Sequence, residues 1–366
     1  MFIVYFKCLR IKENLRGTFM NAKFAVIPEK EKCEIWVEEL SPDSLAPNEL
    51  LVKADYSMVS AGTELAGFCA LSPGVYQKGA WNAYPWRPGY GLSGTIVAAG
   101  SQETSFSPGD RVFCFGKHAS LQVFPMDHTG STPMLSAFSE DERLDSQTIT
   151  ASRMGLVALT ALQISGVQPG ITAAIFGLGT VGNLAAQLYQ NMGTRVIAFD
   201  PIPMRCEVAA KVGINETVCV PPQDQSKVLQ ELTDGKGADI TVDAVGSSAV
   251  LSTCVKSTAA YGKIVLLGTP RAALEGNLTD ILRPIHMKCL QMLGAFEWRL
   301  QPYPGVGITN SIQSNLKMLW GLIYEGKLKV NELISHVVKP EEMQRAYFGL
   351  LNDKDHYLGV MVDWRE

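Results

Sequence analysis

The stretch from Ala173 to Leu188 combines an apolar run, three spaced glycines and a helical pattern in immediate succession. Gly177 permits a tight turn, Gly179 lets the backbone approach a pyrophosphate, and Gly182 lets the helix pack against its strand. The free N–H groups and the partial positive charge at a helix N-terminus favour a phosphate there. The stretch therefore predicts a dinucleotide-binding turn formed by Gly177, Leu178, Gly179, Thr180, Val181 and Gly182.

A second apolar strand follows this helix and ends in a carboxylate, Asp200. Asp200 comes 23 residues after Gly177, the spacing of an acid that accepts hydrogen bonds from an adenosine ribose. Because a carboxylate repels a 2′-phosphate, we expect NAD rather than NADP. Arg205 would flank the adenosine and could weaken this preference, although no basic residue directly follows Asp200.

Composition excludes several classes of protein. The formal charge of −4 provides no basic surface for nucleic acid. No apolar run approaches the roughly 18 residues that span a bilayer, so we expect no membrane insertion. The eight cysteines contain no C-x-x-C pair, which argues against a zinc knuckle or a disulfide framework and favours a cytoplasmic location.

The order of the patterns predicts two domains. Residues 22–124 alternate between polar and apolar positions in short runs, which indicates a small irregular barrel of antiparallel strands. From 173 onward, strands and helices alternate strictly, which is typical of a doubly wound parallel sheet. A helical pattern at 145–164 precedes this region, and helices at 310–324 and 340–351 follow it.

We place the first domain at 20–150, the nucleotide-binding domain at 151–297, and a return to the first domain at 298–366. The substrate would lie in the cleft between them. Residues 1–19 are expected to be an extra segment. Arg16-Gly17 can be encoded by a purine-rich ribosome-binding sequence, so we expect translation to start at Met20 rather than Met1.

Four spaced motifs give the chain from residue 22 onward a resemblance to the medium-chain dehydrogenase/reductase family. They are Arg87–Gly94, Pro108–Val112, Val242–Gly246 and Gly262–Gly268. The resemblance implies an α/β fold, with a GroES-like barrel as catalytic domain and a Rossmann domain for the cofactor. It also implies that Val245, Gly268 and Thr269 lie beside the nicotinamide, and that Ala295 belongs to the backbone segment that holds the carboxamide.

The zinc-containing members of this family have metal ligands at three positions that here are Ala61, Tyr90 and Arg153. These side chains do not make a tetrahedral zinc site, which needs thiolate, imidazole or carboxylate ligands. The four-cysteine lobe of a structural zinc is missing as well. The segments 59–64 and 112–119 instead resemble a zinc-less subgroup associated with bacteriochlorophyllide a dehydrogenase and with putative sugar and polyol dehydrogenases. We therefore expect no metal.

Without a metal, side chains at the cleft must move the proton. The candidates are Thr63, which matches a proton-relay hydroxyl of the family, Glu64, Tyr90, and His118 beside Lys117. Structural roles stay open for each of them. Glu64 would cap a helix, Tyr90 would fill the space that the metal leaves, and His118 would lie on the surface or contact the site residues without touching the substrate. Arg153 is expected to anchor a phosphate or a nearby carboxylate.

These observations favour an NAD-dependent, zinc-independent enzyme that transfers hydride between nicotinamide and a secondary alcohol or ketone. The substrate would be a small molecule, namely a polyol, a sugar or a tetrapyrrole side chain. One alternative is a zinc-less quinone or enoyl reductase of the same fold. Another is a non-catalytic NAD(H)-binding sensor. The family also implies a homodimer that pairs edge strands, and the strand near Leu290 is the candidate.

Overall fold

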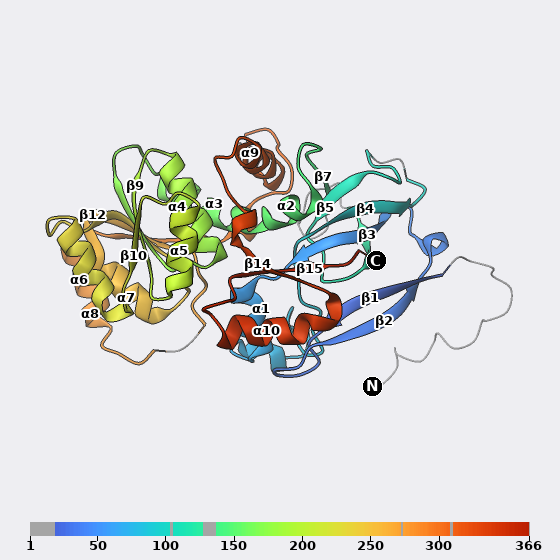
Figure 1. The fold of residues 1–366 in the computed structure, drawn as a ribbon, viewed down its shortest axis with the longest axis horizontal. Coiled ribbons are helices and arrows are strands. Elements are labelled where there is room, and N and C mark those ends of the chain that lie inside the picture. Colours follow the sequence, from blue (N-terminus) through green and yellow to red (C-terminus); the bar gives the residue numbers. More distant parts are fainter. Residues whose placement is uncertain (1–18, 103–104, 127–136, 272–273, 308–309, 366) are drawn as a thin grey trace.

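The computed structural model describes residues 19–102, 105–126, 137–271, 274–307 and 310–365. Most of the predicted extra segment, residues 1–18, therefore lies outside the described residues, and the first strand begins at Met20. Figure 1 shows two lobes side by side, one built on a mixed β-sheet and the other on a parallel sheet covered by helices. No helix in these ranges is both long and apolar enough to cross a membrane.

The barrel-like lobe contains a seven-stranded sheet in the order β14-β15-β3-β4-β5-β7, with β6 also paired to β3. A separate hairpin of β1 and β2 lies against it. The two C-terminal strands join this sheet through the pairing of β15 with β3, so the end of the chain returns to this lobe. The strands are Met20–Val26 (β1), Glu34–Leu40 (β2), Glu49–Met58 (β3), Leu92–Ala99 (β4), Arg111–Cys114 (β5), Leu121–Pro125 (β6), Ala137–Ser139 (β7), Ile334–Val338 (β14) and Gly359–Asp363 (β15).

The second lobe is a six-stranded parallel sheet in the order β10-β9-β8-β11-β12-β13. Its strands are apolar because helices cover both faces. The strands are Thr172–Phe176 (β8), Arg195–Asp200 (β9), Glu216–Cys219 (β10), Ala238–Asp243 (β11), Thr258–Leu266 (β12) and Gln291–Gly294 (β13). The helices between them are Thr180–Asn191 (α4), Pro203–Lys211 (α5), Pro222–Leu232 (α6), Ser248–Ser257 (α7) and Thr279–Met287 (α8).

The predicted helix at 145–164 is two helices, Ser146–Ala151 (α2) and Arg153–Ser165 (α3), which meet at Ser152. The C-terminal helices are Ile312–Tyr324 (α9) and Met343–Asn352 (α10), close to their predicted bounds. The helix Ala61–Phe68 (α1) was not predicted, because it is short and contains two glycines. The strands β7 and β14 and the helix α8 were also missed.

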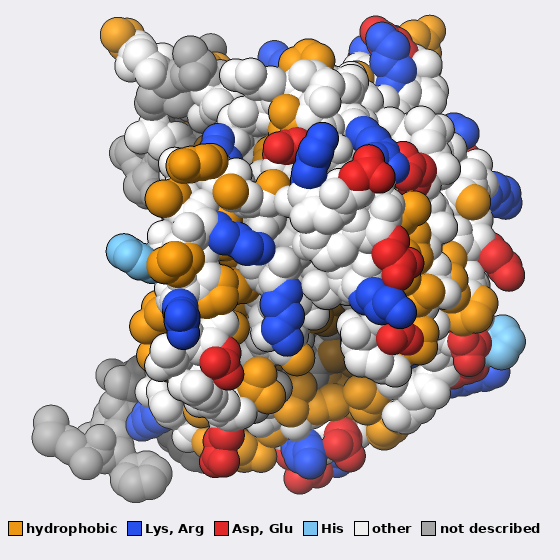
Figure 2. Space-filling model, turned by 90° about the vertical axis from the view of Figure 1, so that its left-hand side faces the viewer, with side chains coloured by type: hydrophobic (Ala, Val, Ile, Leu, Met, Phe, Trp, Pro, Cys, Tyr) orange, Lys and Arg blue, Asp and Glu red, His pale blue; other side chains and the backbone are white. Residues whose placement is uncertain are grey.

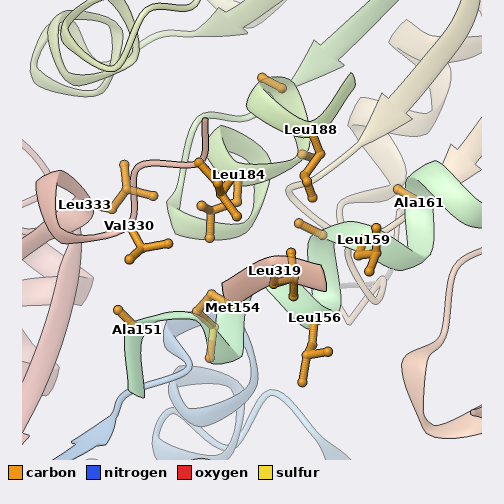
Figure 3. Packing of buried hydrophobic residues seen from close by; sticks show 14 of the residues in the cluster. Ala151, Met154, Leu156, Leu159, Ala161, Leu184, Leu188, Leu319, Val330 and Leu333 are labelled. Atoms are coloured by element: carbon orange, nitrogen blue, oxygen red, sulfur yellow. The ribbon is translucent and has the colours of Figure 1, made fainter. Parts of the chain in front are cut away.

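A core of apolar side chains joins the two lobes. Residues of α3 pack against α4 of the parallel sheet and against α9, as Figure 3 shows for Met154, Leu159, Leu184 and Leu319. All four are at most 1% exposed. This packing fixes α3 between the lobes, and its first residue, Arg153, therefore has a rigid position beside the cavity described next.

Candidate active site

A cavity of about 480 Å³ lies between the two lobes. The barrel-like lobe contributes α1, Tyr90 and residues of the C-terminal helix, and the parallel sheet contributes the loops that follow its strands. In open α/β sheets, ligands bind beyond the carboxyl ends of the strands, and this cavity has that position. The lobes are joined there by α3, which contributes Met154 and Val157.

The glycine turn between β8 and α4 forms one wall of the cavity. Gly177 has a φ of +98°, and a Cβ on Gly182 would lie 1.9 Å from the carbonyl oxygen of Gly177, so both positions require glycine. Gly179 differs, because a Cβ there would meet no atom within 4 Å. The space in front of Gly179 is open, as expected where a ligand approaches the backbone. Thr180, Val181 and the three glycines line the cavity, and Leu178 is fully buried behind it.

Asp200 ends β9, and its side chain is only 2% exposed. Its Oδ2 accepts a hydrogen bond of 2.8 Å from the N–H of Leu178, and its Oδ1 accepts one of 2.9 Å from the N–H of Ile202. Arg205 lies 3.5 Å from Oδ2 and lines the cavity, whereas Asp200 does not. The carboxylate therefore lies beneath the glycine turn and is partly neutralised by Arg205.

The loops after β11, β12 and β13 form the adjoining wall. Val245, Gly268, Thr269 and Ala295 all line the cavity. Asp243 shapes the first of these loops, because its Oδ1 accepts hydrogen bonds of 2.9 Å from the N–H groups of Val245 and Gly246.

Three hydroxyl groups face these loops from the barrel-like lobe. Ser60, Thr63 and Tyr90 line the cavity, and the hydroxyl of Tyr90 is hydrogen-bonded to Oγ of Ser60. Burial raises the pKa of the Tyr90 phenol, so its proton is retained at neutral pH. Arg271 reaches across from the loop after β12 and donates to the carbonyl of Gly62 at 3.0 Å and to Oγ1 of Thr63 at 3.3 Å.

Glu64 and His118 do not line the cavity. Both are 0% exposed, and Nε2 of His118 lies 2.9 Å from Oε2 of Glu64. Oε2 also accepts a hydrogen bond of 2.6 Å from the hydroxyl of Tyr347, and Oε1 accepts one of 2.8 Å from the N–H of Ser60 at the start of α1. Burial opposes the charge of Glu64, but His118 and these donors outweigh it and lower the pKa of Glu64. The pair therefore holds the backbone of Ser60 from the side away from the cavity.

Arg153 is 0% exposed and forms a bidentate ion pair with Glu297, in the 3-10 turn Glu297–Arg299. Its Nη1 donates to Oε2 of Glu297 at 2.8 Å, and its Nε donates to the carbonyl oxygen of Tyr90 at 3.0 Å. Arg153 can be buried as a cation because Glu297 pairs with its charge and its N–H groups donate hydrogen bonds.

Sequence reasoning did not select Ser60, Glu297 or Arg271 as site residues. Ser60 directly precedes the Ala61–Glu64 motif, and its hydroxyl next to Thr63 was the available signal. Glu297 and Arg271 lie in loops without a motif of their own, and only the fold brings them to the cavity.

The fold and the cavity together define a two-domain dehydrogenase, in which a GroES-like domain faces a Rossmann domain. Two family models match the chain: residues 47–140 match the alcohol dehydrogenase GroES-like domain, and residues 180–306 match the zinc-binding dehydrogenase domain. The chain belongs to the medium-chain dehydrogenase/reductase family and is an oxidoreductase of the alcohol and polyol dehydrogenase class. The predicted family and fold class are confirmed.

Known relatives are distant but similar over most of their length. D-guloside 3-dehydrogenase of Escherichia coli is 24% identical, over 84% of this chain and 91% of the relative. 2-Desacetyl-2-hydroxyethyl bacteriochlorophyllide A dehydrogenase of Cereibacter sphaeroides is 25% identical, over 91% of this chain and 95% of the relative. Galactitol-1-phosphate dehydrogenase of Escherichia coli has the same fold, with a TM-score of 0.74 at 20% identity over 93% of this chain and 99% of that structure.

Proposed function

We propose that the protein is an NAD-dependent, zinc-independent oxidoreductase that interconverts a secondary alcohol and a ketone in a polyol, a sugar or a tetrapyrrole side chain. The observation that carries this proposal is the cavity itself. It has a glycine turn open to a pyrophosphate on one wall and three hydroxyl groups on the opposite wall. Such an arrangement supports the binding of a dinucleotide and an alcohol on facing sides of one cleft.

The residues at the positions of the family's catalytic zinc do not fit that metal. Ala61 offers no donor atom, and the guanidinium of Arg153 is a cation already paired with Glu297. The phenol of Tyr90 keeps its proton, because burial raises its pKa. In the described part of the chain, no cluster of three or more His, Cys, Asp or Glu side chains is arranged to hold a metal ion. Zinc ligands in proteins are thiolates, imidazoles and carboxylates, so these three residues do not form a zinc site.

The preference for NAD rests on Asp200. A buried carboxylate at the end of β9 disfavours a second negative charge nearby, as in a 2′-phosphate. Arg205 weakens this repulsion, but its charge is already shared with the Asp200 carboxylate, which lies 3.5 Å away. When bound, NAD supplies the carbon that accepts or gives the hydride.

The proton is the part of the reaction that this chain must handle. Tyr90 lines the cavity, retains its proton at neutral pH, and shares a hydrogen bond with Ser60. We assign it the role of hydrogen-bond donor to the substrate oxygen, with Thr63 as a second hydroxyl beside it. Glu64 and His118 act indirectly, because both are buried: Glu64 accepts the hydrogen bond from the N–H of Ser60, and His118 holds Glu64.

Replacing Tyr90 tests this assignment. Tyr90→Phe should lower kcat by roughly 10²- to 10⁴-fold and leave the affinity for NADH unchanged, since general acid catalysis contributes about that much. Tyr76→Phe is the matched control, because Tyr76 is 70% exposed and does not line the cavity. Full activity of the Tyr90→Phe variant would refute the role of this phenol.

We also propose a homodimer formed through the edge strand β13, in the cytoplasm. All seven described cysteines are free thiols, which suits a reducing compartment. The helix α8, which precedes β13, buries none of its residues, and Leu282, Met287 and Met292 are 54%, 69% and 40% exposed. Figure 2 views the molecule from the end formed by this sheet and its helices, and shows hydrophobic side chains between charged ones.

Light scattering during size-exclusion chromatography tests the dimer. The wild-type protein should have twice the 39.8 kDa mass of one chain, and Met292→Lys should reduce it to one chain. Met318→Lys is the control, because Met318 is 43% exposed but lies on α9. A measured mass of 39.8 kDa for the wild-type protein, which is the mass of one chain, would refute the dimer.

A further inference from the structure

Arg153 contacts Tyr90 in two ways. Its Nε donates to the backbone carbonyl of Tyr90 at 3.0 Å, and its guanidinium carbon lies 4.4 Å from the centre of the Tyr90 ring. A Cβ at Gly91 would lie only 2.7 Å from Cγ of Arg153, so the residue after Tyr90 must be glycine to admit the arginine stem. The conformation of Tyr90 and the position of Arg153 are therefore coupled.

The guanidinium is also enclosed by aromatic rings, because its carbon lies 4.9 Å from the Phe115 ring and 5.6 Å from the Trp298 ring. These rings and Glu297 keep water away from a charge that lies behind Tyr90. Arg153 itself does not line the cavity, whereas Tyr90 and Glu297 do. Arg153 therefore contacts the cavity only through residues that line it, namely Tyr90, Glu297 and Trp298.

The charged groups around Tyr90 come from three elements. Arg153 lies on α3, Glu297 in the 3-10 turn, and Arg271 in the loop after β12, where it acts on Tyr90 electrostatically. Burial raises the pKa of Tyr90, Arg153 lowers it and Glu297 raises it again, while Ser60 and Thr63 lower it through hydrogen bonds. The two members of the ion pair thus shift the pKa of the Tyr90 phenol in opposite directions.

We propose that Arg153 is a positioning residue that orients Tyr90 toward the cavity and stabilises the phenolate left when Tyr90 gives up its proton, and that Glu297 tempers this effect. This inference rests on the proposed function of Tyr90. In ketone reduction, the O–H bond of Tyr90 breaks, a new O–H bond forms on the substrate oxygen, and the hydride comes from NADH. The negative charge left on Tyr90 then belongs to a ring whose centre lies 4.4 Å from the guanidinium carbon. In alcohol oxidation, Tyr90 first releases its own proton to solvent, and the phenolate then accepts the proton of the alcohol O–H bond while NAD accepts the hydride.

The test is a spectroscopic titration of the Tyr90 phenol in the cofactor-free protein. Tyrosinate absorption is measured against pH in each background, and the same background carrying Tyr90→Phe is subtracted. Arg153→Met should raise the pKa of Tyr90 by about one pH unit or more, because it removes the positive charge that lowers this pKa. Glu297→Gln should lower it, and Arg153→Lys should restore most of the wild-type value.

Opposite shifts of the Tyr90 pKa in the Arg153→Met and Glu297→Gln variants support the proposal, since a merely structural role of the ion pair would shift this pKa in the same direction in both. An unchanged pKa, or shifts of equal sign, would overturn it. Thermal melting and NADH binding confirm that each variant folds, and if Arg153→Met does not fold, Arg153→Gln replaces it in the comparison with Glu297→Gln. The titration uses no substrate, so a failure of the proposed alcohol oxidation would leave its result valid and distinguishable.

Discussion

Asp200 Oδ2 accepts a hydrogen bond of 2.8 Å from the backbone N–H of Leu178, and this contact ties the end of β9 to the glycine turn. The same carboxylate lies 3.5 Å from Arg205, which lines the cavity. Asp200 therefore shapes the turn and also supplies a negative charge near the expected adenosine site. A substitution that keeps its shape and removes its charge separates these two roles.

Asp200→Asn removes the charge and keeps the hydrogen bond from Leu178, but its NH2 group cannot accept the second hydrogen bond from Ile202, so the thermal midpoint of the variant is measured alongside. We expect the ratio of the Kd for NADPH to the Kd for NADH to fall by about tenfold, since the repulsion of the 2′-phosphate is lost. Fluorescence titration with each reduced cofactor measures this ratio. Glu207→Gln removes the same charge from an exposed position on α5 and should leave the ratio unchanged. An unaltered ratio in Asp200→Asn would contradict the assigned cofactor preference.

The glycine turn provides a second prediction. A methyl group at Gly179 meets no protein atom within 4 Å, so Gly179→Ala should fold with an unchanged thermal midpoint. The methyl would occupy the space that a pyrophosphate approaches, so the affinity for NADH should fall by at least tenfold. Gly182→Ala is the contrasting variant, because its Cβ would lie 1.9 Å from the Gly177 carbonyl and should disturb the fold itself. Normal NADH binding by Gly179→Ala would count against a pyrophosphate at this turn.

The sequence was sufficient for the features that depend on local pattern. The alternation of strands and helices predicted the parallel sheet, and the spacing of Gly177, Gly179 and Gly182 predicted its first turn. Contacts between distant segments could not be predicted in this way. Glu297 pairs with Arg153 across 144 positions, and Tyr347 bonds to Glu64 across 283. No local pattern indicates which buried charges will meet, because the fold as a whole decides it.

The buried pair of Glu64 and His118 provides a prediction about stability. If one residue of the pair is removed, the other stays buried without a charged or hydrogen-bonding group opposite it. This lowers the stability of the folded protein by about 3 to 5 kcal/mol. Glu64→Ala should lower the free energy of unfolding by that amount, measured as a shift of the thermal transition. The control is Glu341→Ala, because Glu341 pairs with Lys23 at 2.8 Å on the surface and should contribute less than about 1 kcal/mol. Equal effects of the two variants would contradict a structural role for Glu64.

Glu140 provides a prediction about pH. Its side chain is 1% exposed and lies 2.6 Å from Arg111. Burial raises the pKa of this carboxyl from 4.5 to about 7, and Arg111 only partly opposes the rise. The folded protein therefore binds this proton more tightly than the unfolded chain does. Stability from this group is present at low pH and is lost as the pH rises through about 7.

Raising the pH from 5 to 8 should thus destabilise the wild-type protein relative to Glu140→Gln by roughly 2 to 3 kcal/mol. Urea unfolding of both proteins at the two pH values measures the difference. Glutamine resembles the protonated acid, so the variant should lack this part of the pH dependence. A difference between the two proteins that does not change with pH would show that Glu140 does not retain its proton in the folded state.

The most direct test of the proposed function is NADH formation from NAD by purified protein that has been treated with a chelator. The substrates are a panel of polyols, sugars, simple secondary alcohols and hydroxyethyl tetrapyrroles. We expect turnover of at least one class, unchanged by chelation or by added zinc, and lost in Tyr90→Phe. Activity that appears only when zinc is added would contradict the account. So would the absence of turnover with every substrate while NADH still binds, which would favour double-bond reduction or an NAD(H)-binding sensor.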